Sequence, residues 1–137
     1  VMEENRARQL GFTEGIKFVN SATVGVQPQY LGVGPVPAVN QLLARERLTI
    51  NDINVVELNE AFASQTLASM REVGLDAEKT NVNGGAIALG HPLGATGAML
   101  VGRLLSEMKK RPETRYGMVT MCIGVGMGAA GIFEYVR

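Results

Sequence analysis

Three short motifs carry the residues whose types and spacing could do chemistry: an amide, the only imidazole and the only thiol of the chain. The first, Asn59-Glu60-Ala61-Phe62, follows the apolar run Ile53–Leu58. A buried strand is expected over that run, which puts Asn59 at its carboxyl end, where ligands bind in parallel α/β sheets. An asparagine there can orient a water or hold an oxyanion. The alternative is that Asn59 is only a helix N-cap.

The second motif, Asn83–Gly97, surrounds His91 with glycine between a strand end and the start of a helix. Gly90 and Pro92 fix the backbone on both sides, and the positive end of the following helix disfavours an imidazolium. A neutral imidazole can act as a base or donate a hydrogen bond to an oxyanion. The motif lacks the Lys-Ser/Thr pair of phosphate-binding loops, and the alternative is a structural histidine in a tight turn.

The third motif begins at Cys122 and continues through the glycine-rich run Gly124–Gly131. Gly126–Gly131 matches the dinucleotide pattern G-x-G-x-x-G, but a strand is expected after it where a helix is required, so the nicotinamide interpretation is rejected. Cys122 is either a buried structural thiol or a functional group at a strand end, next to glycines whose N–H groups can face a ligand. Since all three motifs follow strands of one sheet, we expect one site at one edge.

The elements that must position this site follow from hydrophobic periodicity and from glycine and proline. The expected order is β-α-β-α-β-α-β-β, which predicts an α/β fold with a five-stranded mixed sheet and helices on both faces. Residues 1–11 are expected to form a lead-in helix or tail. The expected strands are Ile16–Val24, Ile53–Leu58, Lys79–Asn83, Tyr116–Ile123 and Ile132–Val136, and the expected helices are Ala38–Glu46, Glu60–Val73 and Gly94–Lys110.

The last of these helices has almost no polar face in its first three turns. A helix on the outside of a domain should show one apolar stripe, whereas a helix that is apolar all round is buried on all sides. We therefore expect another domain or subunit to pack over Gly94–Lys110.

Composition narrows the classes of function. The chain has 137 residues, 13 Lys and Arg against 13 Asp and Glu, one Cys and one His. That length favours one domain, and the neutral balance does not favour a nucleic-acid partner. One Cys excludes an intrachain disulfide and a Cys-only metal site. No membrane span is expected, because no apolar run reaches about 18 residues, and the location expected is the cytoplasm.

The three motifs resemble the C-terminal motifs of the thiolases, the family of acetyl-CoA acetyltransferases and 3-ketoacyl-CoA thiolases. Gly32–Ala38 is similar to a fourth segment of that family. The resemblance covers nearly the whole chain and implies a thiolase C-terminal domain over residues 1–137. In that family two such halves pack face to face with helices sandwiched between their sheets, so the resemblance also implies that an N-terminal half, absent from this chain, completes the fold.

The resemblance implies Claisen chemistry on coenzyme A thioesters in fatty acid metabolism, with acyl-CoA and CoA as substrates, no metal and no covalently bound cofactor. The nucleophilic Cys would lie on the missing N-terminal half. His91 matches the residue that activates that nucleophile and helps bind a thioester oxygen, and Asn59 matches the holder of a water in the same oxyanion site. Cys122 matches the general acid/base, and the Gly124 N–H matches a donor to the second oxyanion hole.

The resemblance further implies that Phe62, Ala61 and Leu31 line the substrate pocket and that the intact enzyme is a dimer or tetramer of identical subunits. The charge balance and the short apolar runs predict no nucleic-acid or membrane partner. Two positions depart from the family pattern: Val125 replaces a usual glycine, and Leu31 replaces a frequent methionine. An organellar enzyme with its targeting segment outside this chain remains an alternative location.

Two other functions remain open. The first is a self-contained Cys-His hydrolase or acyltransferase with Cys122 as the nucleophile. The second is a non-catalytic scaffold or acyl-CoA-binding module that kept the fold. The ketoacyl synthases are a weaker alternative, because they need His or Asn at the position of Cys122 and the chain has no second His.

Overall fold

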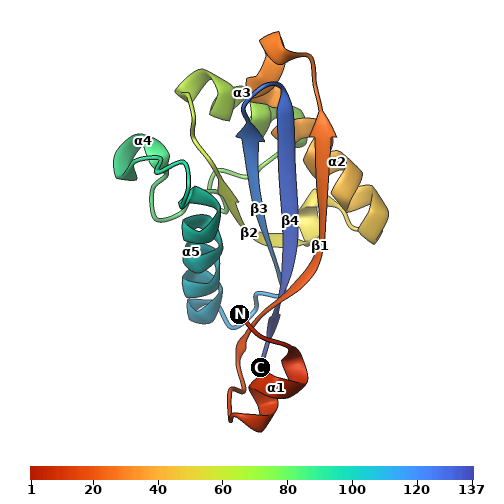
Figure 1. Ribbon diagram of the computed structural model, residues 1–137, viewed down its shortest axis with the longest axis vertical. Helices are drawn as coiled ribbons and strands as arrows, with labels where there is room; N and C mark the ends of the chain where they lie inside the picture. Colours follow the sequence, from red (N-terminus) through yellow and green to blue (C-terminus); the bar gives the residue numbers. More distant parts are fainter.

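A four-stranded mixed sheet is the centre of the computed structural model, which describes residues 1–137 (Figure 1). The strand order is β1-β4-β3-β2. β2 and β3 pair in parallel, while β4 runs antiparallel to both of its neighbours. The elements are α1 Glu4–Gln9, β1 Gly15–Gly25, the 3₁₀ helix η1 Pro28–Val33, α2 Pro35–Glu46, η2 Ile50–Asp52, β2 Ile53–Leu58, α3 Ala63–Val73, α4 Ala86–Leu89, α5 Thr96–Lys110, β3 Tyr116–Ile123 and β4 Met127–Val136.

The expected fifth strand, Lys79–Asn83, is wrong, because this segment makes only a single bridge, between Val56 and Thr80. The side chain of Asn81 ends the pairing. Its Oδ1 accepts from the N–H of Leu58 at 2.9 Å, and its Nδ2 donates to the Leu58 carbonyl at 2.9 Å. The amide group thus takes the place of the next peptide group of a strand, while Asn81 itself has a left-handed φ of 49° that turns the chain away from the sheet.

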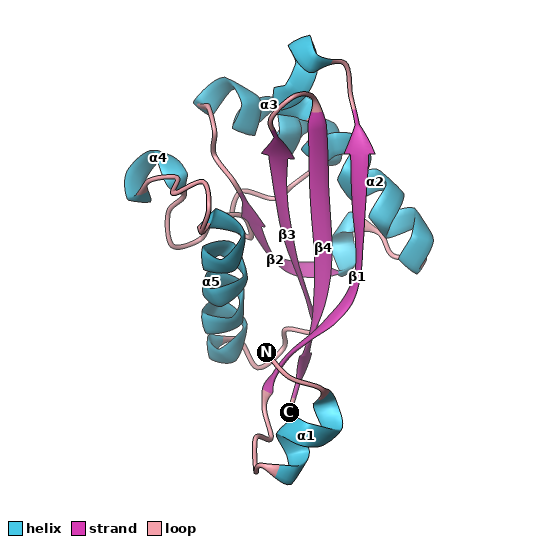
Figure 2. Cartoon of the chain, viewed as in Figure 1, coloured by secondary structure: helices cyan, strands magenta, loops and turns pink.

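Helices cover both faces of the sheet, as expected (Figure 2). On one face, α2 packs against β1, β3 and β4, and the core includes Leu42, Val56 and Leu58. On the other face, α5 packs against β2 and β3, with Val55 and Leu104 in a second cluster. Because successive side chains of a strand point to opposite faces, the apolar residues of β2 supply both cores.

β4 is five residues longer than the expected strand Ile132–Val136, because it also takes in most of the glycine-rich run after Cys122. β1 and β3 flank β4 on both sides, so they supply hydrogen-bond partners along its length. Tertiary pairing here outweighs the low strand propensity of glycine.

Two helices begin where local hydrogen bonds allow. α2 starts at Pro35, three residues before the expected Ala38, since a proline in the first turn has no N–H to leave unpaired. α3 starts at Ala63 and not at Glu60, because the side chain of Gln65 accepts from the N–H groups of the two residues before the helix.

α5 is covered on one side only within this chain. Leu100, Leu104 and Met108 are buried against the sheet, whereas Ala98 and Met99 are exposed. The further domain or subunit that we expect over the exposed side of α5 stays a prediction. No helix of the chain has both the length and the apolar character that a bilayer span requires.

Candidate active site

The candidate site lies at the edge of the sheet where the parallel strands β2 and β3 end. The N–H of Asn59, directly after β2, donates to the carbonyl of Thr120 on β3 at 3.0 Å. Cys122 follows two residues later on β3. The register therefore brings the amide motif and the thiol motif to the same edge, as expected from the sequence.

Asn59 connects this edge to the histidine. Its side chain is 1% exposed, and its Nδ2 lies 3.4 Å from Nε2 of His91. The N-cap alternative for Asn59 is wrong, because α3 begins four residues later, at Ala63. The Oδ1 atom of Asn59 is buried without a hydrogen-bond partner in the chain. Since a buried polar atom without a partner is costly, this oxygen is available to accept from a ligand or a water.

The other ring nitrogen of His91 is held by a residue that sequence reasoning missed, Thr96. Nδ1 lies 2.7 Å from Thr96 Oγ1, and this hydroxyl donates to the carbonyl of Pro92 at 2.9 Å. An amide nitrogen can only donate, so Nε2 of a neutral His91 accepts from Asn59, and Nδ1–H donates to Thr96. This pattern leaves the lone pair of the imidazole on Nε2, facing Asn59.

A signal for Thr96 was present in the sequence. A hydroxyl residue just after a Gly/Pro turn is typical of a helix start, and Thr96 is the first residue of α5. That rule predicts a helix start, but the contact with His91 depends on how the Gly90–Ala95 turn folds back.

Cys122 is half-buried on β3 and is a free thiol. Burial raises its pKa, and a hydrogen bond from the backbone opposes that shift. The thiol therefore keeps its proton at neutral pH, which suits a proton donor more than a nucleophile, because the thiolate is the nucleophilic form. No hydrogen bond joins Cys122 to His91.

The glycine-rich run after Cys122 forms a tight β3–β4 hairpin, since Cys122 pairs with Gly128 and Ile123 pairs with Met127. A strand and not a helix follows the turn, as expected, because β4 begins at Met127. Gly124 is exposed in the turn, and its N–H makes no hydrogen bond to another backbone group. This N–H is therefore available to a ligand.

The expected pocket residues lie around the same end of the sheet. Phe62 is 65% exposed in the loop before α3, and Ala61 beside it is half-buried. Leu31 is half-buried in η1, which packs against α3 and β3. Gly34, between η1 and α2, and Gly128 of β4 let their two segments meet closely, because a Cβ on either would overlap the backbone of the other segment.

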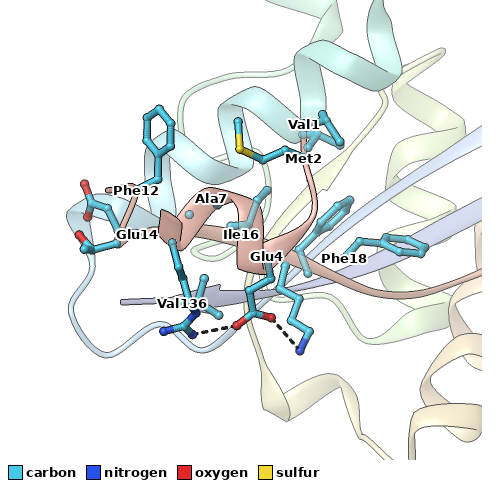
Figure 3. Close-up of a pocket in the computed structure, with 15 residues that line it drawn as sticks. Val1, Met2, Glu4, Ala7, Phe12, Glu14, Ile16, Phe18 and Val136 are labelled. Atoms are coloured by element: carbon cyan, nitrogen blue, oxygen red, sulfur yellow. Dashed lines mark hydrogen bonds and ion pairs between the residues drawn. The ribbon is translucent and has the colours of Figure 1, made fainter. Parts of the chain in front are cut away.

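A cavity of about 600 Å³ lies at the opposite end of the sheet (Figure 3). It is bounded by α1, the start of β1 and the end of β4, with Phe12, Phe18 and Val136 among its lining residues. None of the expected site residues lines this cavity, so it is separate from the candidate site.

Comparisons with known proteins show which family the chain resembles over nearly its whole length. The family model described as "Thiolase, C-terminal domain" matches residues 13–135. The chain is 71% identical over 134 residues to the Staphylococcus epidermidis protein named "Putative acetyl-CoA C-acetyltransferase VraB" and 54% identical over 134 residues to a 3-ketoacyl-CoA thiolase of Bacillus subtilis. Each alignment covers 98% of this chain and 34% of the relative. The chain thus spans about a third of the length of these curated relatives.

A solved structure gives the same result. The crystal structure of the Bacillus anthracis acetyl-CoA acetyltransferase is similar with a TM-score of 0.94 at 38% sequence identity. The match covers 98% of this chain and 34% of that chain.

Proposed function

The chain belongs to the thiolase family through its C-terminal domain, and from that premise we propose that it forms the acid/base half of an acetyl-CoA C-acyltransferase. The reaction joins or cleaves a 3-ketoacyl-CoA. In cleavage, a CoA thiol and a 3-ketoacyl-CoA give acetyl-CoA and a shortened acyl-CoA. Condensation is the reverse reaction: it forms the carbon–carbon bond that cleavage breaks and releases CoA.

His91 acts as the base that activates the nucleophilic Cys, which we propose lies on an N-terminal half. The hydrogen bond from Nδ1–H to Thr96 supports this role, because it fixes the ring and keeps the lone pair on Nε2, where the thiol of the nucleophile would replace the 3.4 Å contact with Asn59. The buried Oδ1 of Asn59 supports the proposal that this residue holds a water next to the thioester oxygen. Preorganised donors at a developing oxyanion typically contribute a few kcal/mol each.

Cys122 moves protons on and off the α-carbon of acetyl-CoA or the sulfur of CoA. The raised pKa of its thiol supports a role as acid in the direction of cleavage. The exposed N–H of Gly124, two residues along the same turn, donates to the second thioester oxygen. Phe62, Ala61 and Leu31 contact the acyl or pantetheine part of the substrate.

The observation that carries this function is the chain of contacts from Asn59 through His91 to Thr96. It joins two motifs that are 32 residues apart at the strand edge where Cys122 lies. The proposed enzyme is a homo-oligomer and works in the cytoplasm. Its mass in solution tests the first property, and localisation of the protein in the cell tests the second.

The direct test measures thiolysis of acetoacetyl-CoA with the chain and an N-terminal half together. We expect His91→Ala to lower kcat about 100- to 10,000-fold, the usual contribution of a general base. We expect Cys122→Ser to slow exchange of the α-protons of acetyl-CoA with deuterium oxide by a similar factor. Glu72→Gln is the matched control, because Glu72 is exposed on α3, outside the site.

Two results would overturn the proposal. Full activity in both site variants would favour a scaffold, and turnover of acetoacetyl-CoA by the 137-residue chain alone would favour a self-contained enzyme with Cys122 as its nucleophile.

A further inference from the structure

The segment that leads into His91 is fixed mainly by polar contacts. The chain between Asn81 and Ile87 runs from beside β2 into the start of α4. Its two larger apolar residues, Val82 and Ile87, belong to neither core cluster, and Ile87 is 65% exposed. Apolar packing therefore contributes little to holding this segment. Asn83 Nδ2 donates to a carboxylate oxygen of Glu107 on α5 at 2.8 Å, and Arg103 donates to the carbonyl of Gly84.

Among the polar contacts of this segment, the one between Glu60 and Ile87 lies nearest to His91 along the chain. One carboxylate oxygen, Oε1, accepts from Asn81 Nδ2 at 2.9 Å, and the other, Oε2, accepts from the N–H of Ile87 at 3.0 Å. A single side chain thus ties both ends of the segment together. Since Glu60 follows Asn59 directly, it also links the segment to the residue whose amide contacts His91.

Gly85 shows how closely this carboxylate is packed. A Cβ built on Gly85 would overlap three atoms of the Glu60 carboxyl group and no other side chain is nearer. The backbone of Gly85, with φ −124° and ψ −165°, is extended and is open to any residue. Glycine is needed here for space and not for conformation.

We propose that Glu60 is a positioning residue for His91: its carboxylate fixes the 81–87 segment and thereby sets the imidazole against Asn59. This inference rests on the proposed function, because it assigns His91 the role of base. Glu60 itself touches no reacting atom. Its two acceptor oxygens meet two donors, which an uncharged amide of the same shape cannot do, since Gln offers one acceptor and one donor group.

The test compares Glu60→Gln, Glu60→Ala, Gly85→Ala and the double variant Glu60→Ala/Gly85→Ala in the thiolysis assay, with Glu72→Gln as the matched control. We expect each single variant to lower kcat by roughly 10- to 100-fold with KM changed less than about threefold, because misplacement of a base acts on the chemical step. We expect the double variant to be no worse than Glu60→Ala, since the space needed by the new Cβ is then free.

A second readout is independent of catalysis. His91 is the only histidine of the chain, so its ring signals in an NMR spectrum need no assignment by mutation. We expect the nuclear Overhauser effect between the Asn59 side-chain amide and the His91 ring to weaken in Glu60→Gln, while signals of Leu42 and Ile132 in the opposite core stay unchanged. If Glu60→Ala does not fold, kcat and the NMR signal are measured in Gly85→Ala and in Glu60→Gln, which keeps the shape of the side chain.

A wild-type kcat and an unchanged Asn59–His91 signal in Glu60→Gln would overturn the inference, as would additive losses in the double variant. These results are distinct from failure of the proposed function. If His91→Ala keeps full activity, the function is wrong; if His91→Ala is inactive and the Glu60 variants are normal, only the positioning role is wrong.

Discussion

At the scale of single residues, the site depends on which ring nitrogen of His91 carries the proton. Asn59 and His91 could be selected from the sequence by type and position, because an amide directly after a buried strand and a single imidazole between glycines and prolines are typical of ligand sites. Thr96 could not be selected in the same way. Its hydroxyl contacts Nδ1 only after the turn through Pro92 brings the start of α5 back to the ring.

We predict that Thr96→Val moves the proton of neutral His91 toward Nε2 and lowers kcat about tenfold or more. The variant keeps the shape of the side chain but removes the oxygen that accepts from Nδ1–H. The ¹⁵N chemical shifts of the single histidine measure the tautomer directly. Thr96→Ser retains the hydroxyl and should behave as the wild type; an unchanged tautomer in Thr96→Val would contradict the assignment.

At the scale of elements, the β3–β4 hairpin contains one residue with a strained backbone conformation. Val125 has a φ of 69° in the turn and is 84% exposed. A β-branched residue in the left-handed region is strained, whereas glycine adopts this conformation freely. Cys122, three residues before Val125, remains paired with Gly128 at the end of β3.

We predict that Val125→Gly stabilises the protein by roughly 0.5–1 kcal/mol. Relief of the left-handed strain exceeds the added entropy of the unfolded chain, and little apolar burial is lost at so exposed a position. Equilibrium unfolding in urea measures the difference. Val125→Ala is the control, since alanine keeps most of the backbone strain; a loss of stability in Val125→Gly would show that the turn holds no such strain.

At the scale of the whole molecule, charged groups connect α5, the sheet and the loop that leads to His91. Glu57 is fully buried in β2, with Arg103 Nε 3.0 Å from its Oε2. Burial raises the pKa of Glu57, and the Arg103 charge opposes that shift. Near the end of α5, the hydrogen bond from Asn83, followed by those from Arg111 and Lys110, lowers the pKa of Glu107 from 4.5 to about 2.

We predict a loss of stability in acid that depends on Glu107. Because its pKa is lower in the folded than in the unfolded protein, its contribution is complete above about pH 4.5 and disappears as the pH falls toward 2. Glu107→Gln should therefore be less stable than the wild type at pH 7, and the difference should shrink toward pH 2. Unfolding midpoints measured between pH 2 and 7 test this, with Glu72→Gln as the control. An equal difference at every pH would mean that the carboxylate charge does not matter.

The sequence by itself determined the types of group at the site and the strands that carry them. β2 and β3 have the bounds expected from their apolar runs, because a strand buried on both faces leaves a continuous local signal. Only the tertiary structure decided which side chains contact one another. The side chain of Asn81 ends the pairing of the expected strand Lys79–Asn83, Thr96 binds the ring of His91, and Glu60 binds the segment before His91. The first and last of these contacts join residues more than 20 positions apart, and all three depend on how turns and elements meet in space, which local patterns of hydrophobicity do not encode.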